Sequence, residues 1–147
     1  MSTFEADLDV ALRDLTDARA DLVSTVERLS SPDLDRARRG GWPISRVIEH
    51  AIEHDYMMAM GASAVRGQPV GPRGEMSCDG QPVDEIICRM ESGRVALLAS
   101  VKDVTEEQFY LLLKLGHEEF SVLSILENAA HHDREHADQI RSILAGA

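Results

Sequence analysis

The sequence has few aromatic residues and a shortage of positive charge. Aromatic residues make up 4% of the 147 residues, and 26 Asp and Glu outnumber 15 Lys and Arg, which gives a formal net charge of -11. Strands favour aromatic and β-branched side chains, so this composition predicts an all-α protein. Because so acidic a chain repels the phosphate backbone of nucleic acids, we expect no nucleic-acid partner.

The sequence also lacks a long hydrophobic run and a targeting segment. No stretch approaches the ~20 apolar residues of a membrane span, and residues 1–5 show neither the basic nor the apolar region of a signal peptide. We therefore expect a cytoplasmic protein with no membrane partner. Cys78 and Cys88 fit no CxxC motif or disulfide framework and are expected to remain thiols. The length predicts a single domain over residues 1–147.

Apolar residues recur at spacings of three and four and predict four helices that share a core. Prolines and glycines separate these stripes, and the segment from Gly67 to Pro82 is predicted to be a loop. The period does not decide between helix and strand for the short apolar run from Phe109 to Leu115. The predicted helices run from Ser2 to Ser31, from Pro43 to a point between Gly61 and Gly67, from Pro82 to about Val101, and from Ser121 to about Leu144.

Two histidines interrupt the apolar stripe of the last predicted helix. His132 and His136 lie four residues apart, which places their imidazoles on one helix face, close enough to share a cation. A buried polar group without a partner costs about 1–3 kcal/mol, so two on adjacent turns suggest a common partner. His50 and His54 repeat this spacing in the second predicted helix. Imidazole ligands without thiolates suit zinc, nickel, iron or copper.

The remaining candidates each have a simpler interpretation. Glu53, Asp55 and Glu135 neighbour the histidines and are weighed as general bases, but helices of a bundle commonly carry solvated carboxylates. His117 and His131 fall off the apolar stripes and are predicted to be solvated. Trp42 is predicted to pack at the start of the second helix. Core filling is predicted for three methionines, Met57, Met58 and Met60.

Two separated sequence patterns carry a family resemblance. The first is Gly40 to Trp42 followed by the stretch Val47 to His50, and the second is His132 to His136 followed by Gln139. Together they resemble the DinB-like superfamily, also called the YfiT-like metal-dependent hydrolases, from the second helix to the end of the chain. The resemblance implies an up-down four-helix bundle with a metal site between helices.

The same resemblance implies a ligand set and a type of chemistry. In that family one histidine of the second helix and two of the last bind zinc or nickel, which corresponds here to His50, His132 and His136. Helical phase places His54 closer to the centre of the apolar face, so His54 either supports or replaces His50. Gln139 corresponds to a family position whose role we interpret as structural.

Some relatives of this fold transfer a low-molecular-weight thiol to an electrophile, others isomerise maleylpyruvate with the help of a thiol, and relatives commonly form homodimers. The resemblance therefore implies a metal-dependent thiol S-transferase or hydrolase, with a thiol and a small electrophilic substrate as partners. The alternative is a non-catalytic metal-binding or stress-related bundle whose ion is structural or stored. No catalytic base is assigned, and an open coordination position would favour the enzyme.

Overall fold

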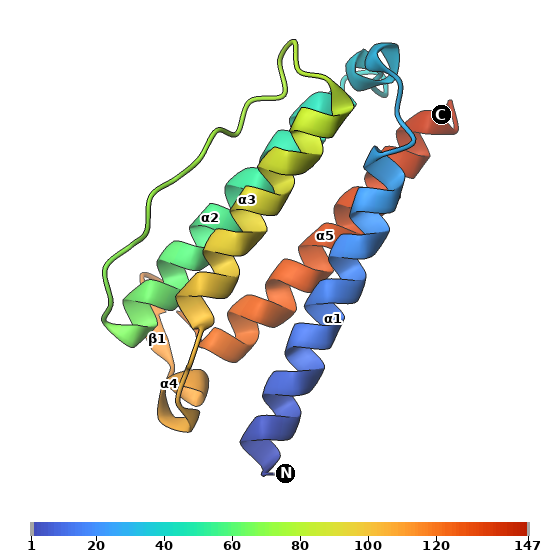
Figure 1. Cartoon of the computed structure of the whole chain (residues 1–147). Coiled ribbons are helices and arrows are strands. Elements are labelled where there is room, and N and C mark those ends of the chain that lie inside the picture. The colour runs from blue at the N-terminus through green and yellow to red at the C-terminus, as the bar shows by residue number, and fades with distance from the viewer. Residues whose placement is uncertain (1, 147) are drawn as a thin grey trace.

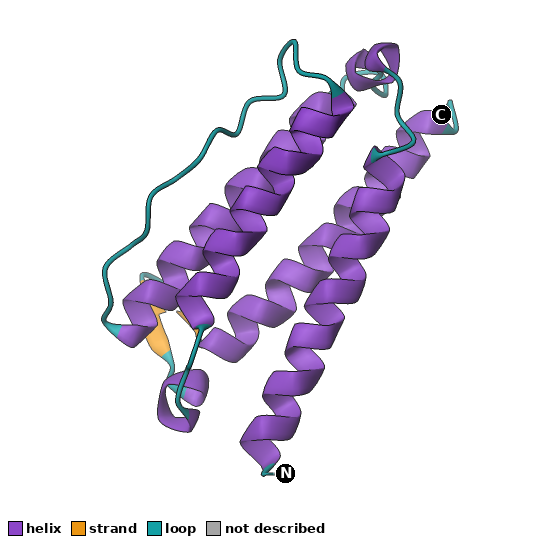
Figure 2. Ribbon diagram, in the orientation of Figure 1, coloured by secondary structure: helices purple, strands orange, loops and turns teal. Residues whose placement is uncertain are grey.

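Four long helices form the body of the molecule, as the sequence predicts. The computed structural model describes residues 2–146, and Figures 1 and 2 show the helices side by side with a small hairpin at one end. The elements are α1 (Thr3–Val26), the 3-10 helix η1 (Ser31–Asp35), α2 (Ile44–Arg66), α3 (Val83–Val101), α4 (Glu106–Tyr110), β1 (Leu113–Leu115), β2 (Glu118–Phe120) and α5 (Val122–Leu144).

Local capping explains where several of these elements begin. The Ser2 hydroxyl accepts a hydrogen bond from the Glu5 amide, and the Glu5 carboxylate accepts one from the Ser2 amide, so the two residues form a capping box at the start of α1. Ser121 caps α5 in the same manner with Ser124. The run that periodicity left undecided is divided, because its first two residues complete α4 and its last three form β1, paired antiparallel with β2.

The order of helix directions differs in one step from a strictly alternating up-down bundle. α1 and α5 run one way, whereas α2 and α3 both run the other way (Figure 1). The 67–82 connection follows the outside of the bundle from the end of α2 back to the level where α2 began. An extended chain covers ~3.3 Å per residue against 1.5 Å in a helix, so this loop is long enough to return along α2. Gly67, at φ 65°, supplies the left-handed turn that ends α2.

The apolar core is divided into two clusters along the bundle axis. One cluster surrounds the start of α2 and the end of α5, and includes Ile44, Ile48 and Ile140. The other surrounds the start of α5 and the end of α3, and includes Leu97, Phe109 and Leu126. Between the two clusters all four long helices contribute polar side chains to the interior, and this polar layer contains the candidate site. No helix within residues 2–146 has the length and hydrophobicity needed to cross a membrane.

Of the three predicted core methionines of α2, one packs against the core and two do not. Met57 is 52% exposed and Met60 is 40% exposed, while Met58 is half-buried. The prediction of core filling is therefore wrong for Met57 and Met60, because α2 turns these two side chains toward a groove, whereas Met58 packs against the second cluster. Methionine side chains can fill irregular apolar space, and here they line that groove.

The two cysteines are free thiols in different environments. Cys88 is exposed, whereas Cys78 is 2% exposed in the 67–82 loop. Burial, reinforced by the nearby Glu49 carboxylate, raises the pKa of Cys78 to about 12. Because the thiolate is the nucleophile, Cys78 remains protonated and unreactive in neutral solution.

We predict that iodoacetamide at about pH 8 alkylates Cys88 and spares Cys78 in the folded protein, because Cys88 is accessible, whereas Cys78 is buried and its pKa is raised to about 12. Mass spectrometry of peptides after timed quenching measures both sites, and the urea-unfolded protein, in which both cysteines react, serves as the control. Labelling of the two thiols at equal rates in the folded protein would contradict the buried position of Cys78.

Candidate metal centre

Three histidines from two helices converge in the polar layer. His50 of α2 and His132 and His136 of α5 each offer one ring nitrogen, and these nitrogens lie within 4.8 Å of one another. The ring centroid of His50 lies 4.9 Å from that of His132 and 5.2 Å from that of His136. α2 and α5 are antiparallel neighbours, so the start of one helix faces the end of the other and brings these residues to one level.

A glutamine of α5 orients His136. Gln139 Oε1 lies 3.0 Å from His136 Nδ1, and because an amide oxygen only accepts, this bond places the proton on Nδ1. The lone pair of His136 is then on Nε2, which lies 3.1 Å from Nε2 of His132. Gln139 therefore acts as the hydrogen-bonding partner that a ligating histidine usually has on its other ring nitrogen.

Side chains of α2 and the preceding turn surround His50. Glu53 Oε2 lies 3.8 Å from His50 Nδ1, and Arg46 donates a hydrogen bond of 2.9 Å to the other carboxylate oxygen of Glu53. Trp42 packs its ring edge-to-face with His50 at 5.3 Å and lies under the Arg46 guanidinium at 4.9 Å. Trp42 therefore packs at the start of α2, as predicted, with 44% of its surface exposed.

His54 supports the cluster from its inner side. Its ring stacks on His132 with a centroid separation of 3.7 Å and an interplanar angle of 11°. Burial, together with the neighbouring imidazoles, lowers the pKa of His54 to about 4 and that of His132 to about 3, so both rings are neutral near pH 7. Neutral imidazole is the form that binds a metal. His54 is the more buried, as its helical phase predicts, but His50 completes the three-nitrogen group.

The donor set fits a divalent transition metal. Burial lowers the pKa of His136 as well. Two of the three candidate ligands, His132 and His136, therefore have a lowered pKa, which favours the neutral imidazole. The facing Nε2 atoms of His132 and His136 have a lone pair on at least the His136 side, and His132 Nδ1 is a buried nitrogen without a hydrogen-bond partner among the described residues. A cation between these rings would give their nitrogens a shared partner that the protein itself does not provide.

The other predicted candidates lie away from the three-nitrogen group. Glu135 is exposed and pairs with His131 at 2.8 Å, so both are solvated surface residues of α5. His117 is exposed in the turn between β1 and β2. Asp55 is 1% exposed and ion-paired, so the interpretation of it as a solvated carboxylate is wrong. Glu53 is the carboxylate that lies beside a histidine of the group.

Asp55 belongs to a buried charge quartet that the sequence analysis did not find. The charge quartet consists of Arg19 of α1, Asp55 of α2, Arg94 of α3 and Asp133 of α5. Arg19 contacts the two carboxylates at 2.8 and 3.0 Å, and Arg94 contacts them at 3.1 and 2.7 Å. All four side chains are at most 11% exposed, and their formal charges cancel.

Backbone oxygens complete the hydrogen bonding of the quartet. Arg19 also donates to the Met90 carbonyl at 3.0 Å, and Arg94 donates to the Leu15 carbonyl at 3.2 Å. Burial alone would raise the pKa of Asp133, but the two guanidinium groups outweigh it and hold that pKa below its usual value. Asp133 is therefore ionised, whereas deeper burial raises the pKa of Asp55 in spite of the same two guanidinium groups.

The sequence does contain a signal for the quartet. Arg19 lies four residues after Leu15 and three before Leu22, and so occupies the buried stripe of α1. Arg94 has the same relation to Met90 and Leu97 in α3. Charged residues at core positions of two helices indicate partners of opposite charge inside the bundle, because an unpaired buried charge is strongly unfavourable.

Comparison with known proteins places the fold and the family. The sequence profile of the DinB superfamily matches residues 14–140, which include the candidate histidines and the whole charge quartet. The chain belongs to the DinB superfamily. This membership confirms the family indicated by the patterns around His50 and His136.

One solved structure similar to this DinB superfamily chain is the crystal structure of TT2238, described as a four-helix bundle protein. It is 21% identical in sequence, and the match covers 90% of this chain and 96% of that one with a TM-score of 0.67. The likeness confirms the four-helix bundle. No curated protein matches the chain.

We predict that Asp133→Asn lowers the free energy of unfolding by about 3–5 kcal/mol, because it leaves two buried guanidinium groups with one carboxylate. Urea unfolding followed by circular dichroism measures this change. The matched control on the same helix is Asp138→Asn, whose carboxylate is 79% exposed and pairs with Arg141, and whose cost should stay below about 1 kcal/mol. Equal stability of the two variants would show that the quartet does not hold the bundle together.

Proposed function

We propose that His50, His132 and His136 bind one divalent transition metal ion, zinc or nickel, and that the protein is a metal-dependent enzyme. The reaction we propose is transfer of a small thiol to an electrophilic carbon, with hydrolysis as the related alternative within the same class. The observation that carries this proposal is the group of three histidine nitrogens, which has no fourth His, Cys, Asp or Glu ligand among residues 2–146. Three protein ligands leave positions for a substrate, as in catalytic rather than structural metal sites.

The contribution of each residue follows from its contacts. A bound metal would lower the pKa of a thiol or water and so supply a nucleophile at neutral pH. Gln139 keeps the proton of His136 on Nδ1, so that Nε2 remains a ligand atom. Glu53, held by Arg46, lies beside Nδ1 of His50 and favours a proton there. His54 stacks behind His132 and restricts its rotation.

The proposed transfer is a nucleophilic substitution, in which the thiol sulfur replaces a leaving group on the electrophilic carbon. The thiol releases its proton, its sulfur forms a bond with the electrophilic carbon, and the bond from that carbon to the leaving group breaks with the electron pair on the leaving group. Glu53 lies behind the His50 ring and is ion-paired with Arg46, so the proton released by the thiol passes to water.

We predict that His136→Ala abolishes zinc or nickel binding, because it removes a ligand and the Gln139 contact that orients it. Equilibrium dialysis followed by elemental analysis measures the metal bound per chain, about one in the unaltered protein. His131→Ala is the matched control, because His131 is on the same helix but 72% exposed. Full retention of metal in the His136 variant would contradict the assigned ligand set.

We predict that the metal-loaded protein accelerates the reaction of a thiol with 1-chloro-2,4-dinitrobenzene, which releases chloride and forms a coloured thioether. Glutathione, cysteine, mycothiol and bacillithiol are assayed separately, and the His136→Ala variant and the chelated protein serve as controls. The rate should fall to the uncatalysed level in both controls. Metal binding without turnover, with any of these thiols or in hydrolysis of an activated ester, would instead support a stored or structural ion.

A further inference from the structure

A groove lies along the seam between α2 and α5, about one helical turn from the histidine cluster. It has a volume of about 810 Å³ and lies toward the β1–β2 hairpin. Asn128 of its lining is four residues before His132, and Met58 is four residues after His54, so each lies one helical turn from the cluster and on the same helix face. The near end of the groove therefore lies one helical turn from the histidines, on the same side of α2 and α5.

The groove is lined mainly by flexible apolar side chains. Met57, Met58 and Met60 form its α2 side, and Phe120 and Ile125 form the opposite side. A Cβ atom at Gly61 would lie 3.3 Å from Ile125 and 3.4 Å from Phe120, so this glycine lets the α2 backbone approach them closely. Unbranched thioether side chains adapt to apolar ligands of different shape, and the exposed Met57 and Met60 are accessible for such contacts.

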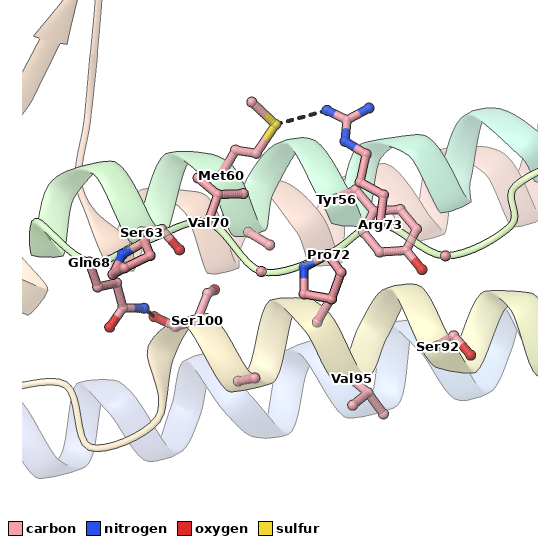
Figure 3. A pocket seen from close by; sticks show the side chains of 16 residues that line it. Tyr56, Met60, Ser63, Gln68, Val70, Pro72, Arg73, Ser92, Val95 and Ser100 are labelled. Atoms are coloured by element: carbon pink, nitrogen blue, oxygen red, sulfur yellow. Dashed lines mark hydrogen bonds between the residues drawn. The ribbon is translucent and has the colours of Figure 1, made fainter.

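The 67–82 loop separates this groove from a second cavity. Arg73 donates a hydrogen bond to the Met60 sulfur at 2.8 Å, and this contact is drawn in Figure 3. The second cavity lies between α2 and α3 and is lined by Tyr56, Ser63 and the loop (Figure 3). Tyr56 follows His54 by two residues, so this cavity lies on the other side of α2 and does not open toward the metal centre.

The charges around the groove disfavour an anionic ligand. Its charged lining residues are Arg73, Glu118 and Glu119, which together carry more negative than positive charge, in a chain whose net charge is -11. Asn128, next to His132 in helical position, contributes an amide at the end that faces the metal centre. The lining thus combines an apolar body with one neutral polar group near the proposed reaction site.

We propose that the α2–α5 groove binds the hydrocarbon part of an uncharged aromatic or alkyl electrophile and directs its reactive carbon toward the histidine cluster. This inference rests on the proposed function, because it names the substrate class of that same site. The carboxylates of Glu118 and Glu119 disfavour phosphorylated or carboxylated hydrocarbons of equal size. The amide of Asn128 contacts the polar end of the electrophile.

Binding to the zinc-loaded protein tests the groove without a thiol or any reaction. The probes are 2-naphthalenemethanol and its anionic counterpart 2-naphthalenesulfonate, titrated against protein labelled with 13C in its methionine methyl groups. We expect the alcohol to shift the resonances of Met57, Met58 and Met60, and the sulfonate to bind at least about tenfold more weakly. Equal affinity for the two probes, or shifts that spare these methionines, would overturn the proposal.

Groove-filling variants locate the binding site. Ala64→Trp and Asn128→Trp place a large ring in the groove at exposed positions, and each should weaken binding of the alcohol by at least about tenfold while zinc content is unchanged. Val95→Trp, at a 59% exposed position lining the cavity of Figure 3, is the matched control and should bind normally. Loss of binding in the control alone would assign the ligand to the other cavity and overturn the proposal.

The two proposals fail in distinguishable ways. If the probe does not bind in the groove but the thiol assay shows turnover, the substrate class is wrong and the enzyme function stands. If the probe binds as expected and no thiol reacts or ester is hydrolysed, the enzyme function is wrong and the groove remains a ligand site. Retained zinc content in the groove variants separates either result from damage to the metal centre.

Discussion

The buried charge quartet is the interaction on which the arrangement of this bundle depends. It joins one side chain from each long helix, and it lies where the two apolar clusters would otherwise meet. Hydrophobic contacts alone tolerate sliding and rotation of helices, whereas charged hydrogen bonds at 2.7–3.1 Å permit one register. The quartet also spans the seam between α1 and α3, where a cavity of about 430 Å³ shows that apolar packing is incomplete.

This register also determines the position of the histidines. Asp55 follows His54, and Asp133 follows His132, so the carboxylates and the imidazoles lie about 100° apart around their helices. When Arg19 and Arg94 fix the carboxylates, the rotation of α2 and α5 is fixed, and the rings turn toward the seam between those two helices. The ligands are thereby held by the core of the bundle, which is the rigid support that a metal centre needs.

Sequence periodicity predicted the four helices and the histidine pair of α5, because spacings of three and four directly report a helix face. It could not choose between His50 and His54, since burial favours His54 whereas the partner nitrogens on α5 select His50. The quartet and the exposed methionines were missed for a related reason. Helical phase identifies the inward face of a helix but not the neighbouring helix that this face contacts. That neighbour depends on α2 and α3 running in the same direction. The sequence of the 67–82 loop does not indicate whether the chain returns along α2 before α3 begins.

The two long seams of the bundle therefore have opposite chemistry. The α1–α3 seam is closed by guanidinium groups that are already paired with carboxylates, so Arg19 and Arg94 have no free charge to offer a ligand. The α2–α5 seam has neutral imidazoles with lone pairs and, beyond them, an apolar groove without ion pairs among its described lining residues. Because the ion-paired arginines lie on the far side of the helices, a nucleophile formed at the histidines would lie next to the apolar groove and not next to a buried charge.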